Sequence, residues 1–567
     1  MQSARQWEAA YDQGVPRHLT YPGLPLHALL ERTAHEHPEI IATVFGGAVG
    51  HRCIDAAMTY RNLDELADRF AAGLQRLGVK KGDRVALVLP NCPQFVYSFF
   101  GSLKAGAVVV PTNPLYTVRE LHNQLADSGA RVVVVLSRLY PQVAEAAIGT
   151  SVERIVVTNV KEHFPVALRV LFTAVRERKE GHRVDISGDA RAMWLRDLLA
   201  ERSARVPVEV APADLAVLQY TGGTTGVPKA AMLTHYNIFA NVIQTESWAH
   251  GSLRRGEDTY LLVIPFFHIY GFTVGMMEGV WRGVQQVLIP KYDVEALLTA
   301  IRDYRPTYFP AVPTIYISLL NHPKAKEYGI DKVRIFNSGS APLPVEVIEQ
   351  FERITGGTLN EGYGLSEASP VTHSTPSLGR RKPGSIGLPL PDTEMKIVDL
   401  ETGTREVAVG EEGELCIAGP QVMKGYWNRQ DETAIALRTD AEGRTWLYTG
   451  DVARMDEDGY TYIVQRKKDM IIVSGFNVYP SEVEGVLYTH PAVIEAAVIG
   501  VPDAYRGEAV KACVVLKSGA TATSEELKEH CEGGLAEFKV PREIEIRQSL
   551  PKTAVGKILH RVLREEN

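Results

Sequence analysis

Short apolar runs that alternate with helical patterns limit this chain to a few folds. Three of these runs are Asp83–Pro90, Ala107–Pro111 and Arg131–Leu136. Helical patterns over 96–105 and 115–128 separate them. Strands that are apolar on both sides belong to parallel sheets whose two faces are covered by helices. The alternation returns over 259–339, so the sequence predicts an α/β fold with two parallel-type lobes.

The pattern changes between about Gly384 and Val464. Segments such as 394–398 alternate apolar with polar side chains, and Gly-containing turns such as Thr402-Gly403 separate them. This spacing is typical of antiparallel hairpins. It predicts a small β-barrel-like lobe that completes a large N-terminal domain.

A new unit begins after the charged stretch Arg466–Asp469. Its expected strands and helix are 496–501, 510–516 and 524–535. A charged, exposed linker is a plausible hinge between domains. We therefore predict an N-terminal domain over 1–465 and a mobile α+β C-terminal domain over 466–567.

Composition excludes several classes of protein. The 567 residues include 61 Lys and Arg against 68 Asp and Glu, a formal net charge of -7. A nucleic-acid-binding protein needs a basic footprint, so we expect no nucleic-acid partner. The five cysteines contain no CxxC pair, which argues against a disulfide scaffold or a zinc site and favours a reducing cytoplasm. The polar stretch 1–16 lacks the apolar region of a signal peptide.

One segment tests whether the chain spans a membrane. Leu261–Met277 contains no Asp, Glu, Lys or Arg. It falls short of the roughly 18 residues that a spanning helix needs, and it includes Pro265 and Gly271. We interpret it as a buried strand, a loop and a core helix.

A basic segment, Lys161–Arg183, carries six Lys and Arg against three Glu. Its apolar side chains at helical spacing are Leu168, Leu171, Phe172 and Val175. Two interpretations stay open. The segment 163–183 is either an amphipathic helix that rests on anionic lipid at the inner face of the membrane, or a helix packed on its own domain with a solvated charged face.

The strongest local signal is the nine-residue stretch Thr221–Lys229, which reads TGGTTGVPK and follows an apolar run. Three glycines permit positive φ, so backbone N–H groups, hydroxyls and Lys229 can surround an anion. Val227 stands where the Walker A motif has glycine, so this is a phosphate loop of another kind. The chain contains neither GxSxG nor HExxH, and nothing predicts a covalent enzyme intermediate.

Five motifs occur along the chain in a specific order. They are TGGTTGVPK at 221–229, YGLSE at 363–367, YTGD at 448–451, RKKD at 466–469 and PKTAVGK at 551–557. Together they resemble the adenylate-forming superfamily of acyl-CoA synthetases, peptide-synthetase adenylation domains and luciferases. Longer stretches, such as NPLYTVREL at 113–121 and GPQVMKGYW at 419–427, are most similar to bacterial long-chain fatty acyl-CoA synthetases.

The resemblance implies a two-step reaction with ATP and CoA as substrates and Mg²⁺ as cofactor. A fatty carboxylate attacks the α-phosphate of ATP, giving acyl-AMP and pyrophosphate, and the CoA thiol then displaces AMP. Both reactants of the first step are anionic. Charge neutralisation and positioning are therefore expected to dominate catalysis, rather than acid–base chemistry.

The resemblance also implies roles for individual residues around the nucleotide. The β- and γ-phosphates are held by Thr221, Gly222, Gly223, Thr224, Thr225, Gly226 and Lys229. Magnesium is held by Glu367, whose carboxylate is a suitable hard ligand. The adenine lies against Gly339, Ser340, Ala341, Tyr363 and Gly364, and the ribose against Asp451 and Arg466.

Catalytic and mobile positions follow in the same way. Lys557 bridges the carboxylate and the α-phosphate, and it forms the predicted catalytic set with Glu367 and Thr221. The acyl group is placed beside His268, Tyr270 and Val274. Between the two steps the C-terminal domain rotates about Lys468 and brings Gly475 to the pantetheine channel.

The alternatives differ in substrate rather than in fold. They are a medium-chain or aryl acid–CoA ligase, a fatty acyl-AMP ligase that loads a carrier protein, and a non-catalytic acyl-nucleotide-binding protein. Retention of both Glu367 and Lys557 argues against the last. Chain-length preference and oligomeric state stay open, with a homodimer as one hypothesis.

Overall fold

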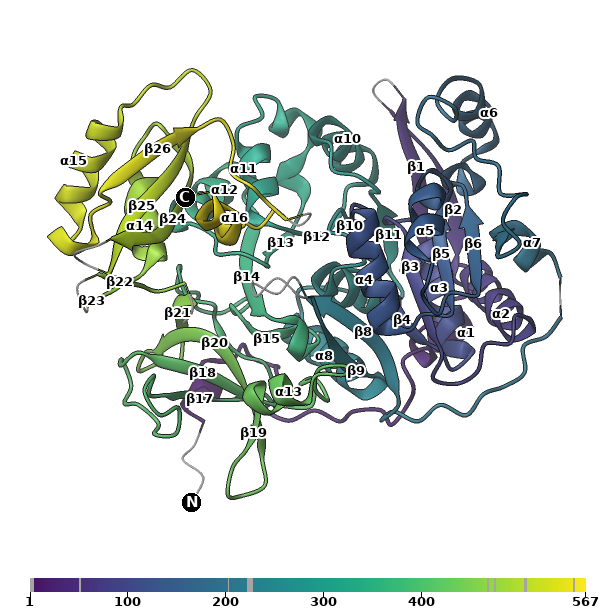
Figure 1. Cartoon of the computed structure of the whole chain (residues 1–567), viewed down its shortest axis with the longest axis horizontal. Helices are drawn as coiled ribbons and strands as arrows, with labels where there is room; N and C mark the ends of the chain where they lie inside the picture. Colours follow the sequence, from purple (N-terminus) through teal and green to yellow (C-terminus); the bar gives the residue numbers. More distant parts are fainter. Residues whose placement is uncertain are drawn as a thin grey trace.

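The computed structural model describes residues 5–49, 52–201, 203–221, 228–466, 469–473, 476–503, 507–553 and 556–566. Several predicted positions lie outside the described residues, namely Gly222, Gly223, Thr224, Thr225, Gly226, Lys468 and Gly475. The described residues form four sheets (Figure 1).

The first sheet has seven strands in the order β7-β6-β5-β3-β4-β8-β9. Their bounds are β3 Arg84–Val88, β4 Val108–Pro111, β5 Val132–Leu136, β6 Arg154–Thr158, β7 Ala192–Trp194, β8 Leu215–Thr221 and β9 Lys229–Thr234. All neighbours are parallel except β8 and β9. The valine runs predicted as strands are confirmed, and β5 is buried throughout.

Helices cover this sheet on both faces, which is why its strands can be apolar on both sides. They are α2 Tyr60–Arg76, α3 Pro93–Lys104, α4 Val118–Ser128, α5 Tyr140–Ala146 and α7 Leu195–Ala200. The lobe also contains α6 Val166–Val175, which packs on the turn over Val160–His163 rather than on the strands. Every residue of α3 is buried, as expected of a helix that packs between a sheet and α2.

The second sheet has nine strands in the order β16-β15-β14-β13-β12-β10-β11-β1-β2. Their bounds are β1 Ile41–Val49, β2 Arg52–Thr59, β10 Thr259–Leu262, β11 Gln285–Leu288, β12 Tyr308–Ala311, β13 Ile335–Ser338, β14 Thr358–Gly364, β15 Val371–Ser374 and β16 Leu388–Pro389. The central strands from β14 to β1 are parallel, and antiparallel strands close both edges. The associated helices are α1 Ala28–Glu36, α8 His235–Trp248, α9 Glu278–Arg282, α10 Val294–Tyr304, α11 Pro313–Leu320 and α12 Val345–Thr355.

The uncharged segment Leu261–Met277 begins in this sheet, in strand β10. β10 ends at Leu262, and a π-helix over Gly271–Met277 leads into α9. All seven residues of the π-helix are buried, so the expected strand and core helix are confirmed. Across the described ranges, no helix combines the length and the apolar character that crossing a bilayer requires.

The third lobe is an open sheet, so the prediction of a small barrel needs correction. Its strands are β17 Glu394–Val398, β18 Gly413–Ala418, β19 Leu437–Thr439, β20 Thr445–Met455 and β21 Thr461–Arg466, and α13 Gln430–Ala436 lies beside them. The long strand β20 pairs with β19 at one end and with β21 at the other. Both partners occupy the same edge of β20, so the sheet has no strand left to close it onto β17.

The C-terminal residues form a separate α+β unit. Its strands are β22 Ile471–Val473, β23 Phe476–Val478, β24 Val493–Asp503, β25 Gly507–Leu516 and β26 Glu543–Arg547, and its helices are α14 Pro480–Thr489, α15 Ser524–Gly534 and α16 His560–Glu565. Strands β24 and β25 and helix α15 were predicted from the sequence. The unit has its own apolar core around Val483, Val498 and Val514.

The basic segment forms the surface helix α6 at one corner of the first lobe (Figure 1). Phe172 points inward and packs on Phe164 and His182, with ring centroids 5.6 and 5.5 Å apart. Leu171 and Val175, which the spacing grouped with Phe172, are exposed instead. The sequence left the orientation of α6 open, and spacing alone does not select its inward side because α6 is apolar around most of its circumference.

Candidate active site

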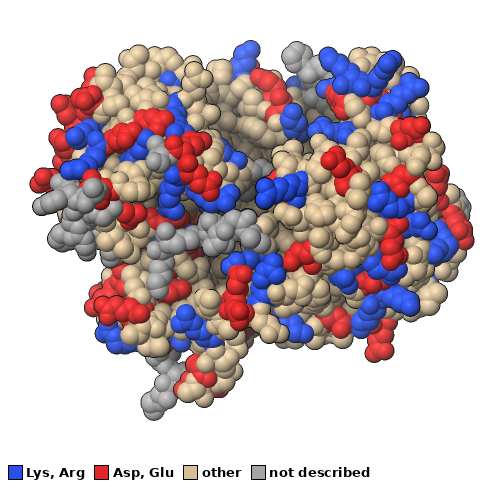
Figure 2. Space-filling view, viewed as in Figure 1, with Lys and Arg blue, Asp and Glu red and all other residues tan. Residues whose placement is uncertain are grey.

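A cavity of about 1620 Å³ lies where the two parallel sheets, the third lobe and the C-terminal domain meet. Figure 2 shows the surface hollowed between these parts. The carboxyl ends of β13 and β14 open into the cavity, as is usual for ligand sites of open α/β sheets. Its wall contains Thr221, Lys229, His268, Tyr270, Val274, Gly339, Ser340, Ala341, Tyr363, Gly364, Glu367, Asp451, Arg466 and Lys557. Every described residue that the sequence assigned to the site therefore lines one space.

One end of the cavity is organised around the Asp451 carboxylate, which is 2% exposed. Asp451 and Arg466 face each other across β20 and β21, and Nε of Arg466 lies 2.9 Å from Oδ1 of Asp451. The hydroxyl of Tyr363 donates to Oδ2 of Asp451 at 2.5 Å. Burial and the nearby carboxylate raise the pKa of Tyr363, and Asp451 raises the pKa of Arg466. At neutral pH this cluster is a hydrogen-bonded carboxylate–guanidinium pair.

Two glycines let the backbone approach closely beside this cluster. A Cβ on Gly364 would lie 2.2 Å from the carbonyl oxygen of Pro370. A Cβ on Gly339 would lie 3.1 Å from the ring of Tyr270. Ser340, in the loop after β13, has a φ of 71°, a strained backbone conformation. Gly339, Ser340 and Tyr363 all line the cavity.

Glu367 is positioned by a segment far along the chain. The stretch around Tyr426 runs antiparallel to β9, with a bridge between Ala231 and Tyr426. This pairing brings the hydroxyl of Tyr426 to Oε1 of Glu367 at 2.7 Å. The backbone N–H of Met423 also donates to the carbonyl of Glu367, at 2.8 Å. Glu367 is thus held at the cavity wall by two contacts.

Thr221 and Lys229 face each other in the antiparallel pair β8–β9, at the two ends of the predicted phosphate loop. The ammonium of Lys229 forms an ion pair with Glu432 of α13. It also lies 5.5 Å from the ring centroid of Tyr426. A cation is therefore fixed at the cavity wall next to Glu367.

The opposite end of the cavity is apolar. Its wall includes Trp248, Ala249 and Leu253 together with Val274 from the π-helix. Tyr270 uses its hydroxyl to donate to the side-chain and backbone oxygens of Asn337, at 2.6 and 2.8 Å. Tyr270 is therefore anchored to β13 and presents only its ring to the cavity.

His268 lies between the apolar and polar ends. Burial, with the Lys557 ammonium nearby, lowers the pKa of His268 to about 4. At neutral pH it is an uncharged imidazole, which suits a group that faces an acyl chain or a carbonyl rather than a phosphate.

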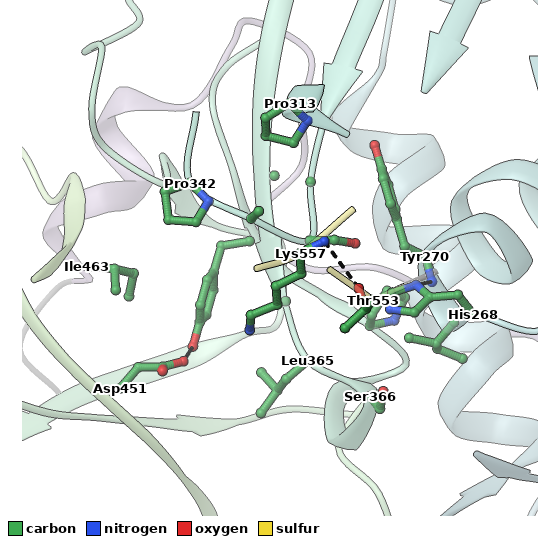
Figure 3. A pocket seen from close by; sticks show the side chains of 18 of the residues that line it. His268, Tyr270, Pro313, Pro342, Leu365, Ser366, Asp451, Ile463, Thr553 and Lys557 are labelled. Atoms are coloured by element: carbon green, nitrogen blue, oxygen red, sulfur yellow. Dashed lines mark hydrogen bonds between the residues drawn. The ribbon is translucent and has the colours of Figure 1, made fainter. Parts of the chain in front are cut away.

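Lys557 reaches this space from the C-terminal domain. Lys552 and Ile558 form an antiparallel bridge, and Thr553 exchanges two hydrogen bonds with Lys557, at 2.8 and 3.1 Å. Gly556 lies against α11 of the N-terminal domain, where a Cβ would be 2.6 Å from Oγ1 of Thr314. Figure 3 shows Lys557 projecting between Asp451 on one side and His268 on the other. The loop thus carries a cation from one domain into the pocket of the other.

The wall residues that were not predicted from the sequence include Tyr426, Glu432 and Glu361. Tyr426 lies within GPQVMKGYW, a motif that was recognised but given no role. Glu432 belongs to none of the recognised motifs, and its role becomes visible only in its ion pair with Lys229. Glu361 precedes the YGLSE motif and is 9% exposed in the middle of β14.

Comparison with known proteins identifies the family. The family model described as AMP-binding enzyme matches residues 30–427, and the AMP-binding enzyme C-terminal domain matches residues 482–557. The chain belongs to the AMP-binding enzyme family. The second match falls within the C-terminal unit, whereas the expected boundary at 465/466 stays a prediction.

Named relatives and solved structures span nearly the whole chain. It is 45% identical to a long-chain-fatty-acid–CoA ligase of Bacillus subtilis, over 100% of this chain and 99% of that protein. A ligase of the same name from Escherichia coli O157:H7 is 42% identical over 90% of each chain. ATP-bound MatB from Rhodopseudomonas palustris has a TM-score of 0.81 at 28% identity, over 96% of this chain and 99% of that one. An anthranilate CoA ligase in complex with anthranoyl-AMP also has a TM-score of 0.81 at 28% identity, over 96% and 97% of the two chains.

The buried Glu361 is expected to make the stability of the protein depend on pH. Burial raises its pKa from 4.5 to about 8, against the effect of a hydrogen bond from the backbone N–H of Leu343. The folded protein then binds one more proton than the unfolded chain between these values, so its stability falls as the pH rises from about 5 to 8. The change is at most about 1.4 kcal/mol per pH unit.

We expect Glu361→Gln to flatten the decline of Tm between pH 5 and pH 8. The exposed Glu349 of α12 provides a matched control, and Glu349→Gln should keep the wild-type slope. Thermal denaturation at several pH values measures this. Identical slopes for Glu361→Gln and the wild type would mean that Glu361 ionises normally.

Proposed function

We propose that this protein is an AMP-forming long-chain fatty acid–CoA ligase. It activates a fatty acid with ATP to acyl-AMP and pyrophosphate, and then transfers the acyl group to CoA with release of AMP. The observation that carries the proposal is a single cavity with a polar end built on Asp451, Glu367 and Lys229, an apolar end, and Lys557 between them. The similarity to ligases of this name over the full length of the chain supports the same activity.

The two ends of the cavity suggest where each part of acyl-AMP binds. The Asp451 carboxylate accepts the ribose hydroxyls, with Arg466 holding the carboxylate in place. The adenine lies between Tyr363 and the loop over Gly339, Ser340 and Ala341, close to Gly364. The phosphates extend toward Thr221, Lys229 and the loop 222–226. The acyl chain continues past His268 and Tyr270 into the apolar end near Val274.

Glu367 is the residue that would hold Mg²⁺. In the described part of the chain no group of three or more His, Cys, Asp or Glu side chains could enclose a metal ion. A single carboxylate fits the usual coordination of Mg²⁺, which is bound by one or two carboxylates together with substrate phosphates and water. When bound, the ion neutralises charge on the phosphates. Tyr426 would keep Glu367 oriented for this role.

Charge placement explains how the first step proceeds. The fatty carboxylate and the polyphosphate repel each other, and a cation between them lowers that cost most where water is excluded. Lys557 supplies this cation between the two reactants as the carboxylate oxygen attacks the α-phosphorus and pyrophosphate leaves. Lys229 balances the charge on the departing pyrophosphate, and Glu432 must give up its ion pair with Lys229 to permit this.

The second step requires the Lys557 loop to leave. The loop lines the cavity through Thr553, Gly556 and Lys557, so in our proposal it occupies space that the CoA thiol needs, and it belongs to the C-terminal domain 466–567. We therefore infer that this domain rotates relative to residues 1–465 about the linker at Lys468 and brings Gly475 to the pantetheine of CoA. The CoA sulfur then attacks the acyl carbonyl, and AMP departs with the bonding electron pair.

The substrate class follows from the apolar end of the cavity. Trp248, Ala249, Leu253 and Val274 offer an acyl chain an apolar wall, and the carboxylate that also lines the cavity there, Glu278, is paired with Arg282 at 2.9 Å. The similarity to ligases named for long-chain fatty acids favours a long-chain acid over the aryl or medium-chain alternative. We further propose peripheral contact with the membrane through 163–183, because long-chain acids partition into lipid. The homodimer stays a prediction.

The role of Lys557 is tested by separating the half-reactions. We expect Lys557→Ala to lower pyrophosphate release from ATP and a fatty acid by at least about a hundredfold, because the variant loses a preorganised cation. Thioester formation from supplied acyl-AMP and CoA should change less than threefold. Lys517→Ala, which removes an exposed lysine of the same domain, is the control. Equal losses in both half-reactions would contradict a role for Lys557 that is specific to adenylation.

The substrate class is tested with a series of acids under identical conditions. We expect kcat/KM for CoA thioester formation to rise with chain length up to long-chain fatty acids, because each added methylene buries apolar area. Benzoate and short acids should be poor substrates. A maximum at aryl or short acids would overturn the long-chain assignment. Acyl-AMP accumulation without transfer to free CoA would favour a carrier-loading ligase.

A further inference from the structure

Helix α6 carries apolar side chains that its own fold leaves uncovered. Fifteen large apolar side chains are exposed in the described part of the chain, and four of them lie on this one helix. Val166, Val170, Leu171 and Val175 are 74%, 64%, 47% and 62% exposed. Elsewhere such side chains are scattered singly, which needs no explanation. The concentration of four such side chains on the ten residues of α6 does need an explanation.

The exposed residues form a continuous face. We call Val166, Ala167, Val170, Leu171, Ala174 and Val175 the outer strip; all six are exposed. Positions four residues apart lie on the same side of a helix, so these three adjacent pairs stack along it. Phe172 holds the opposite side of α6 against the first lobe. The outer strip is therefore fixed in an outward orientation.

Basic side chains lie on α6 and directly after it; Arg169 donates to the backbone carbonyl of Glu162 at 3.1 Å, and Arg176 pairs with Glu180 at 2.7 Å. Arg169, Arg176, Arg178, Lys179 and Arg183 are all exposed. Among residues placed by the structure, no carboxylate forms an ion pair with Arg178, Lys179 or Arg183. The half-buried Glu177 is occupied by Lys161 at 2.7 Å. Figure 2 shows Lys and Arg gathered over this corner of the molecule.

We propose that the outer strip and the basic side chains beside it are a docking surface for an anionic lipid bilayer. The proposal rests on the peripheral contact proposed above and identifies the face of α6 that makes it. An interfacial helix combines an apolar face that enters the headgroup region with Lys and Arg that bind anionic headgroups. Here α6 supplies the apolar face, and Arg178, Lys179 and Arg183, which follow α6 along the chain, supply the exposed charges. A nucleic acid would match the charges but leave the outer strip in water.

The location of α6 makes the surface separable from catalysis. No residue from 161–183 contributes to the wall of the active-site cavity. The helix lies on the first lobe, away from the C-terminal domain that carries Lys557 (Figure 1). Changes to the outer strip are therefore expected to leave acyl-AMP formation from a water-soluble acid unchanged.

The test is cosedimentation of the full-length protein with lipid vesicles. Vesicles of phosphatidylglycerol mixed with phosphatidylcholine are compared with vesicles of phosphatidylcholine alone, at low and high salt. We expect binding to the anionic vesicles that weakens with salt. The double variant Val170→Asn with Leu171→Asn should bind at least about tenfold more weakly, because the apolar contact is lost without any change in charge. Arg178→Gln with Lys179→Gln should lose roughly fivefold for each charge removed.

Val409→Asn is the matched control, because Val409 is 47% exposed on the third lobe. This variant should bind as the wild type does. Unchanged vesicle binding by both double variants, with wild-type Tm and adenylation, would overturn the docking surface while leaving peripheral contact intact. Absence of vesicle binding by the wild type would overturn both. A dimer in solution that Val170→Asn with Leu171→Asn dissociates would show that the strip binds a second copy instead. None of these outcomes would contradict the proposed ligase activity.

Discussion

The approach of the Lys557 loop to α11 is the contact on which the active site depends. Gly556 leaves no room for a side chain against Thr314, and the hairpin around it holds Lys557 over the cavity. Without this contact, the polar end would keep Asp451, Glu367 and Lys229, and no cation would lie between the two anionic reactants. Preorganised charge in a water-excluded space has the largest effect on a reaction between anions. The proposed domain rotation follows from the same contact, because the loop that favours the first step blocks the second.

Most of the fold could be predicted because local sequence and tertiary structure agree. The valine runs at 108–111 and 132–136 are buried on both faces, as their composition requires. Two features could not be predicted in this way. The hairpins of the third lobe look the same in an open sheet and a barrel, since closure depends on which edges of β20 are used. The inward side of α6 could not be predicted because a helix with apolar side chains on most sides has no preferred orientation until a tertiary contact, here Phe172 with Phe164, forms.

The residues of the candidate site were predicted from sequence motifs. Motifs do not show the contacts that residues of different motifs make with one another. Asp451 and Arg466 come from separate motifs, and only the pairing of β20 with β21 places them 2.9 Å apart. Tyr426 and Glu432 were missed because their partners, Glu367 and Lys229, are distant in sequence. The net charge of -7 gave no guide to the anion site, because charge matters locally. Lys229, Lys557 and Arg466 all line one cavity in an acidic chain.

The most direct test of this account is to lock the Lys557 loop in place. A disulfide between Thr314→Cys and Gly556→Cys would join the two positions that the structure brings into contact. Pyrophosphate and acyl-CoA are then measured before and after reduction, with each single variant as a control. The account predicts that the oxidised enzyme forms acyl-AMP and pyrophosphate but no acyl-CoA, and that reduction restores the thioester. Acyl-CoA formation at the normal rate by the fully oxidised enzyme would contradict it.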